Sequence, residues 1–188
     1  MDDLTRLLLD AQRGDRDALE RFVAATHRDV VELCRYLGDR DNADDLAQET
    51  YQRAVSSLHR YRATGPAKHW LLTIARRTCA DATRRRARQR RLRRKVGELS
   101  VDEHRDPIPV TEQPEIEELL HVLDDDRRAA FVLTQLSGFR YDEAAAILGV
   151  PVGTIRSRVA RARDQLLQQL QQHTDADREP PLRRQRPG

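Results

Sequence analysis

Apolar residues recur every three or four positions along most of this chain, which is the spacing of one buried face of an α-helix. In the first half, the predicted helices cover residues 4–11 (ended by Gly14), 19–37 (capped by Asp17, ended by Gly38), 43–58 (capped by Asn42) and 70–95. The sequence has neither the alternating apolar pattern of β-strands nor an internal repeat. It therefore predicts an all-α fold.

The most informative pattern lies in residues 139–166 and predicts a helix-turn-helix. Gly149 suits the left-handed residue that often ends a helix, and Pro151 suits the start of the next. Apolar stripes on the two helices can pack together: Ala144, Ala145 and Leu148 on the first, and Ile155, Val159, Ala162 and Leu166 on the second. A turn of about 100° per residue places Gly153, Arg156, Ser157, Ala160 and Arg161 opposite the second stripe.

The second helix of a helix-turn-helix fits the major groove of DNA, where arginine can donate two hydrogen bonds to guanine. The outward residues could read base edges, whereas Arg158 and Arg163 on the flanks could hold phosphates. The alternative is an amphipathic surface helix with a solvated basic face.

Charge divides the 188 residues into segments. Residues 1–97 carry 22 basic and 14 acidic side chains, residues 98–126 carry 1 and 11, and residues 127–188 carry 11 and 6. The acidic stretch contains Pro107, Pro109 and Pro114, which indicates a linker, and the pattern becomes helical again from Glu115. We therefore expect two small helical domains, 1–97 and 115–172, joined by a flexible acidic linker, 98–114, and followed by a disordered basic tail, 173–188.

Three polar features of the first domain require an explanation. Helix-start chemistry explains Asp44 and Asp45 but not Glu49, which lies about two turns into its helix. The run from Arg84 to Lys95 places nine basic residues in twelve, so it favours a polyanion unless it is simply solvated. The segment 59–70 mixes aromatic and cationic side chains, as a single-stranded nucleic acid site does, although Trp70 could equally be a core residue.

Other classes of function find little support. The sequence lacks a phosphate loop, zinc-ligand spacing and a nucleophile elbow, so we expect neither an enzyme nor a cofactor. Cys34 and Cys79 are most simply reduced cytosolic thiols, with a disulfide or redox switch as the alternative. No apolar run approaches the ~20 residues of a membrane span, and the acidic N-terminus is unlike a signal peptide. We expect a cytoplasmic protein without membrane insertion.

Two ordered blocks of sequence resemble the extracytoplasmic-function (ECF) sigma factors of the sigma-70 family. Residues 37–50 (LGDRDNADDLAQET) and 70–77 (WLLTIARR) resemble region 2, and residues 123–163 resemble region 4. The resemblance covers roughly residues 8–92 and 115–170. One departure is Arg140, which stands where the family usually has a Ser or Thr helix cap, worth about 1 kcal/mol.

The resemblance implies a bacterial transcription initiation factor that binds core RNA polymerase through its clamp coiled coil and flap. It implies that region 2 binds the clamp through Asp41, Asp44, Asp45, Gln48 and Glu49. It assigns single-stranded −10 DNA to Tyr61, Arg62, Lys68, Trp70, Arg76, Arg77 and Arg84. It assigns duplex −35 DNA to Thr154, Arg156, Ser157, Arg158, Ala160, Arg161 and Arg163. An anti-sigma factor is a possible further partner. A stand-alone helix-turn-helix regulator remains the alternative, and transcription with core polymerase distinguishes the two.

Overall fold

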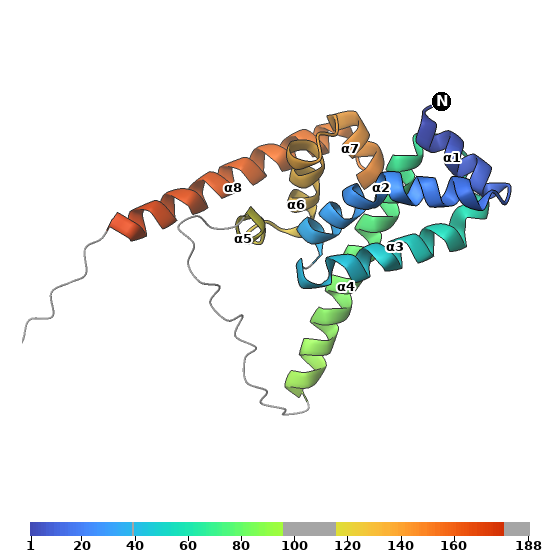
Figure 1. The fold of residues 1–188 in the computed structure, drawn as a ribbon. Coiled ribbons are helices and arrows are strands. Elements are labelled where there is room, and N and C mark those ends of the chain that lie inside the picture. Colours follow the sequence, from blue (N-terminus) through green and yellow to red (C-terminus); the bar gives the residue numbers. More distant parts are fainter. Residues whose placement is uncertain (39, 96–115, 179–188) are drawn as a thin grey trace, which may run out of the picture.

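The computed structural model describes residues 1–38, 40–95 and 116–178, and within them every regular element is a helix. The N-terminal unit contains α1 (Asp3–Gln12), α2 (Arg16–Leu37), α3 (Ala43–Ser57) and α4 (Ala67–Lys95). Short 3-10 turns, η1 (Arg40–Asn42) and η2 (Leu58–Arg60), flank α3. Helices α2, α3 and α4 pack against one another, and α1 packs against α2 (Figure 1). The all-α prediction is confirmed for the described residues.

The core of the N-terminal unit is built from the helix faces that the apolar spacing predicted. Phe22, Val30 and Leu33 of α2 and Leu71 and Leu72 of α4 are each no more than 1% exposed. Burial of one such side chain contributes about 1.5–3 kcal/mol, so this shared stripe is the main source of stability for the α2–α4 pair.

The helix starts differ in part from those predicted. The Asp15 carboxylate accepts a hydrogen bond from the Ala18 N–H (3.0 Å), so Asp15 caps α2 and the predicted cap, Asp17, lies within the first turn. There its charge still favours the positive end of the helix dipole. Asn42 precedes α3 as predicted, but its side chain makes no capping hydrogen bond. The fourth helix begins at Ala67, one turn before the predicted Trp70.

The C-terminal unit contains α5 (Ile116–Leu120), α6 (Asp125–Phe131), α7 (Tyr141–Leu148) and α8 (Val152–Arg178), and a π-helical turn, η3 (Val132–Leu136), continues α6. Helix α8 packs against α6 and α7. Gly149 has φ 68° at the end of α7, which confirms the predicted left-handed turn. Helix α8 continues to Arg178, beyond residue 172, where the basic tail was predicted to begin, because residues 173–178 contain no Gly or Pro to end the helix.

The start of α7 compensates in part for the cap that Arg140 cannot supply. An arginine side chain has no acceptor, but the Glu143 carboxylate accepts a hydrogen bond from the Arg140 N–H (2.8 Å). The Arg140 guanidinium also pairs with Asp142 (2.9 Å). One orphan donor of the helix start is therefore satisfied from within the helix.

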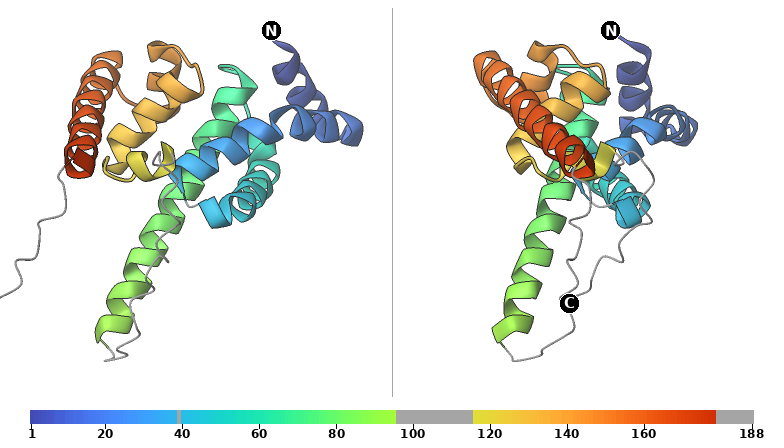
Figure 2. Two further views of the ribbon diagram at one scale, coloured as in Figure 1. Left: turned by 60° about the vertical axis from the view of Figure 1, so that its left-hand side comes forward. Right: turned by 90° about the vertical axis from the view of Figure 1, so that its left-hand side faces the viewer.

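The two units pack directly against each other. Helix α4 contacts α7, and α2 contacts α5, α6 and η3. The buried apolar side chains of both units form one continuous cluster. The C-terminal half of α4 extends away from this body (Figures 1 and 2). The predicted linker, 98–114, and the tail from 179 onward lie outside the described residues.

Candidate nucleic-acid and polymerase interfaces

Helix α8 presents the face that the sequence predicted. Ile155, Val159 and Ala162 are buried against the rest of the C-terminal unit. The residues predicted to lie opposite are all exposed: Gly153, Arg156, Ser157, Ala160 and Arg161. Thr154 is half-buried, and its carbonyl accepts a hydrogen bond from the Ser157 hydroxyl (3.0 Å). The outer face of α8 is thus free of neighbouring elements and can approach a duplex.

The two flanking arginines of α8 are held by neighbouring helices. Arg158 forms an ion pair with Asp126 at the start of α6. Arg163 donates to the side-chain oxygen of Gln135 (2.6 Å). The flanking guanidiniums therefore have fixed positions beside the exposed face, whereas Arg156 and Arg161 extend into solvent.

The predicted polymerase-binding residues gather at the start of α3, and we call Asp41, Asp44, Asp45, Gln48 and Glu49 the acidic edge. All of them are exposed except Glu49, which is half-buried. Glu49 pairs with Arg53 (2.6 Å) and with Arg85 of α4 (3.0 Å). Arg53 also bonds Asp81 of α4 (2.8 Å). Glu49 thus joins α3 to α4, which accounts for a carboxylate two turns from the helix start.

The aromatic residues of the predicted −10 site pack inside the N-terminal unit. Tyr61 is 5% exposed, and its hydroxyl donates to the Gly65 carbonyl (3.0 Å). Its ring lies 5.1 Å from the ring of half-buried Trp70, and burial raises the pKa of the Tyr61 phenol. The Tyr61 ring therefore packs against Trp70 and the loop, and neither face of the ring is exposed in this arrangement.

Several cationic residues of the same predicted site face the C-terminal unit. Lys68 pairs with Asp29 of α2 (2.8 Å), and its ammonium lies 5.4 Å from the centre of the Phe139 ring. The neighbouring His69 ring meets Phe139 edge-on at 5.6 Å, and its Nε2 lies 3.8 Å from Glu143. This part of α4 is covered by α7 and the loop before it.

The remaining −10 candidates differ in exposure. Arg62 and Arg77 are exposed. Arg84 is exposed and pairs with Asp81 (2.6 Å). Arg76 is half-buried, and its Nε is buried without a hydrogen-bond partner among the described residues. Burial lowers the pKa of Arg76, with a further contribution from nearby arginines.

A polar cavity of about 170 Å³ separates α4 from α6 at this point. Its lining residues come from both units: Leu37, Arg76, Cys79, Ala80, Thr83, Arg84, Asp125, Asp126, Arg128 and Ala129. Sequence periodicity could not find this cavity, because it depends on how the two units are placed.

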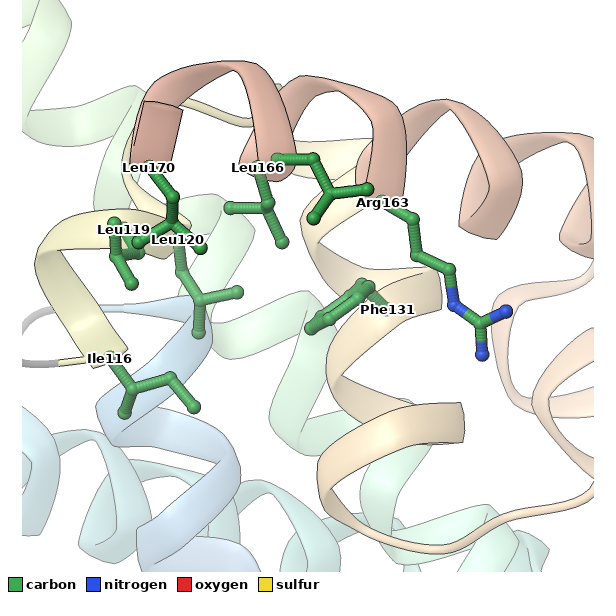
Figure 3. Close-up of a pocket in the computed structure, with 8 residues that line it drawn as sticks. Ile116, Leu119, Leu120, Phe131, Arg163, Leu166 and Leu170 are labelled. Carbon is green, nitrogen blue, oxygen red and sulfur yellow. The ribbon is translucent and has the colours of Figure 1, made fainter. Parts of the chain in front are cut away.

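An apolar groove of about 330 Å³ lies on the C-terminal unit between α5 and α8. Its walls carry exposed Leu167 (57%), Ile116 (41%) and Leu170 (39%). Figure 3 shows the leucines of α8 and α5 turned toward one another over Phe131, with the Arg163 guanidinium pointing away. A groove with exposed leucines at its rim can receive the apolar face of a helix.

Two further features were missed or left open by the sequence. Arg35 of α2 forms an ion pair with buried Glu117 of α5, which links the two units. Cys34 and Cys79 are free, buried thiols that contact each other between α2 and α4. The hydrogen bond with Cys34, together with burial, raises the pKa of Cys79, so Cys79 packs in the core as a neutral thiol.

Among the described residues, no helix combines the length and the apolar character needed to cross a membrane.

Two family models match the chain, in the order that the folded units follow. The model for sigma-70 region 2 matches residues 22–89, and the model for sigma-70 region 4 matches residues 113–166. The first match contains all of α3 and most of α2 and α4, and α5 to α8 begin within the second.

Curated relatives agree over most of the length. The ECF RNA polymerase sigma factor SigC of Mycobacterium tuberculosis is 46% identical over 165 residues, which are 87% of this chain and 89% of that protein. The ECF RNA polymerase sigma factor EcfG of Rhodopseudomonas palustris is 39% identical over 132 residues, or 69% of this chain and 71% of that protein.

Solved structures share the fold. The structure of CnrH in complex with the cytosolic domain of CnrY gives a TM-score of 0.70 at 27% identity and covers 90% of this chain and 98% of that one. The sigma factor RpoE in complex with the anti-sigma factor NepR from Bartonella quintana gives 0.67 at 30% identity, covering 81% and 96%. Family models, relatives and fold thus agree on a non-catalytic protein that directs transcription initiation by RNA polymerase, and the chain belongs to the ECF sigma factors of the sigma-70 family.

Proposed function

We propose that this sigma factor recognises its promoter at two places, with α8 on the −35 duplex and α4 with its preceding loop on the separated −10 strand. The observation that carries the proposal is the exposed outer face of α8, which lies opposite the buried side chains of Ile155, Val159 and Ala162. The corresponding domains are residues 1–97 and 115–172, joined by a linker over 98–114 and followed by a basic tail over 173–188, of which residues 173–178 continue α8.

On the −35 element, Arg156, Ser157, Ala160 and Arg161 face the base edges in the major groove. Their exposure and the absence of ion pairs at the two arginines among the described residues support this assignment. The flanks of α8 hold phosphates through Thr154, Arg158 and Arg163. Neighbouring groups fix the positions of these side chains, which suits contact with the DNA backbone better than base recognition.

On the −10 element, Arg62, Arg77 and Arg84 contact the strand first, since they are exposed in the packed arrangement. Lys68, Trp70 and Arg76 follow once the C-terminal unit moves off α4. Tyr61 acts through its contact with Trp70. Separating the strands costs roughly 1.4 kcal/mol per base-pair step, and a stacked base returns about 1–3 kcal/mol. The isolated sigma factor should therefore bind promoter DNA weakly and depend on polymerase.

The acidic edge of α3 binds the clamp coiled coil of core RNA polymerase. Its exposed carboxylates suit a basic partner, and Glu49 also fixes α3 on α4 through Arg85. The apolar groove between α5 and α8 receives the polymerase flap. Leucines exposed at its rim would become buried on docking, which supports this second contact.

We propose an anti-sigma factor as a further partner. Of the similar structures, that of RpoE is a complex with the anti-sigma factor NepR, and that of CnrH is a complex with the cytosolic domain of CnrY. Such a partner would use the same groove and the same face of α4 as polymerase and promoter. We also propose that the protein acts in the cytoplasm, where polymerase and promoter are found.

Run-off transcription tests the proposal. Core polymerase alone should give no promoter-dependent transcript, and addition of this chain should produce one from a promoter that contains both elements. Replacing Asp44 and Asp45 with Asn should lower transcript yield by weakening association with core polymerase, whereas Arg156→Ala should leave association intact and lower yield only at promoters that need the −35 element. Failure of the full-length chain to associate with core polymerase would exclude the polymerase-binding assignment.

A further inference from the structure

The cavity between α4 and α6 is lined by the half-buried side chain of Arg76. The Nε of Arg76 is buried and has no hydrogen-bond partner among the described residues. A buried N–H donor without a partner is costly, and such donors in proteins normally have one. An anion in the cavity that Arg76 lines would supply this partner.

The other charged groups around the cavity are already engaged. Asp126 pairs with Arg158. Asp125 lies 3.9 Å from Arg128, whose guanidinium also donates to the carbonyls of Leu120 (3.1 Å) and Leu123 (2.9 Å). Arg84 is held by Asp81 (2.6 Å). Arg76 is therefore the charge left over among these groups.

Three arginines and one carboxylate act on the pKa of Arg76 from nearby. After burial, the strongest neighbouring effect on its pKa is repulsion from Arg77, and Arg158 and Arg84 act in the same direction. Only Asp126 opposes them. An anion that enters the cavity would be attracted by several arginines at once.

The size of the cavity limits the ligand. At about 170 Å³ it is smaller than the ~300–1,000 Å³ of pockets that hold nucleotides or drug-sized molecules, but larger than the ~30 Å³ of one water. A small inorganic anion fits, and a nucleotide does not.

The geometry of the donors favours an oxyanion. The N–H groups of a guanidinium are arranged in one plane to meet two oxygens, as in arginine–phosphate pairs. A tetrahedral anion also points oxygens toward the opposite wall, where Arg128 of α6 keeps Nη1 outside its bonds to Leu120, Leu123 and Asp125. Chloride cannot bridge the two walls in this way, and a small carboxylate would bring only one charge.

We propose that the cavity between α4 and α6 binds a small tetrahedral oxyanion of the phosphate class, with Arg76 as its principal donor. The anion bridges the two units and stabilises their packed arrangement. This site lies beyond the promoter and polymerase contacts proposed above, although Arg76 can serve DNA phosphates once the units separate.

The test uses the full-length chain with ¹⁵N-labelled arginine side chains and inorganic phosphate, without polymerase or promoter. Ionic strength and pH are held constant with sodium chloride. The Arg76 Nε–H signal, identified by its loss in Arg76→Lys, should shift and saturate with a Kd on the order of 1 mM. The signal of exposed Arg77, identified in the same way, should not saturate.

Thermal unfolding supplies a second measurement. Phosphate should raise the Tm of the unaltered chain more than chloride at equal ionic strength. Arg76→Gln should weaken the apparent phosphate affinity at least tenfold, whereas Arg88→Gln, the matched control at an exposed arginine of α4 that does not line the cavity, should change it less than twofold. Asp126→Asn removes a carboxylate that repels the anion, so this variant should bind phosphate more tightly.

An effect of sulfate on the Tm and on the Arg76 signal equal to that of phosphate would support an oxyanion as the ligand. An equal effect of chloride, the absence of saturation, or phosphate binding that is unchanged in Arg76→Gln would overturn the proposal. Because neither polymerase nor DNA is present, these outcomes are independent of the promoter contacts.

Discussion

The hydroxyl of Thr73 on α4 lies 3.3 Å from the main-chain carbonyl oxygen of Ile147 on α7, to which it donates a hydrogen bond between the two units. Thr73 follows Lys68 and precedes Arg76 on the same helix, so this contact lies in the middle of the face proposed for −10 DNA. On the proposed −10 assignment, the packed arrangement and −10 binding compete for the same surface. Weakening the contact between the units should favour −10 binding.

Phe139→Ala tests this competition. The Phe139 ring contacts both His69 and Lys68 of α4 but is only half-buried, so its loss should cost about 1–2 kcal/mol of packing between the units, less than the ~3–5 kcal/mol of a fully buried Phe. That is roughly a 5- to 30-fold shift toward separated units. Small-angle X-ray scattering should show a larger radius of gyration. Val55→Ala, at an apolar side chain of α3 that is 49% exposed, is the control and should leave the radius unchanged.

The stability of the contact between α3 and α4 should depend on pH through Asp81. Hydrogen bonds from Arg53 and then Arg84 hold the pKa of Asp81 below its ordinary value. A lowered folded-state pKa stabilises the fold above the unfolded pKa of ~3.9, and this contribution is lost as pH falls through the folded value. Since the carboxylate is 40% exposed, Asp81→Asn should lower the free energy of unfolding by less than about 1 kcal/mol at pH 7.

Urea unfolding at pH 7, 4 and 3 measures this effect. The stability difference between the unaltered chain and Asp81→Asn should shrink steadily as the pH falls below 4. A difference that stays constant over this range would mean that the ion pairs with Arg53 and Arg84 do not contribute.

Two glycines allow the effect of backbone strain to be distinguished from the effect of steric crowding. Neither Gly149 nor Gly153 has an atom near the position of an added Cβ, but Gly149 has φ 68° and Gly153 lies in the first turn of α8. Gly149→Ala should therefore destabilise the C-terminal unit by about 1–2 kcal/mol, whereas Gly153→Ala should be neutral or stabilising by up to about 1 kcal/mol. Thermal unfolding monitored by circular dichroism distinguishes the two. An equal loss of stability in both variants would assign the effect to crowding and contradict the role of the turn.

Helix periodicity predicted which faces are buried because each helix packs on neighbours near in sequence. Ile155, Val159 and Ala162 are spaced for one side of a helix, and the structure buries all three. The same reasoning gave the exposed residues of α8 that face the opposite way. Local capping was less predictable, because Asp15 and Asp17 are both suitable acceptors and only the backbone path selects Asp15.

What the sequence could not reveal depends on the contact between the two units. Lys68 and Arg76 are residue types typical of a nucleic-acid site. The periodicity of apolar residues in the sequence does not show that α7 and α6 cover them. Tyr61 likewise has the residue type of a stacking platform, and its burial follows from the loop that returns over Trp70. Contacts between segments far apart in sequence leave no local signal in a single chain.

Arg156 and Arg161 should discriminate between promoter sequences, whereas Arg163 should not. Replacing either outward arginine with Ala should cost about 1–3 kcal/mol on the preferred −35 sequence and little on a mismatched one. Arg163→Ala should weaken binding to both by a similar factor and lower the salt dependence. Competition binding of holoenzyme to matched and mismatched −35 duplexes measures each ratio. An equal loss for Arg156→Ala on every sequence would place that residue among the phosphate contacts.

The apolar groove between α5 and α8 gives a final prediction that tests polymerase binding apart from DNA. Leu167 lines the groove and is 57% exposed, so Leu167→Ser should change the free energy of unfolding by less than about 0.5 kcal/mol. If the flap buries this side chain, the variant should bind core polymerase several-fold more weakly, since burial of a leucine is worth about 1.5–3 kcal/mol. Leu92→Ser is the matched control, because Leu92 is 56% exposed and lies on α4, away from the groove. Equal polymerase affinity in the two variants would remove the groove from the polymerase interface and leave it to another partner.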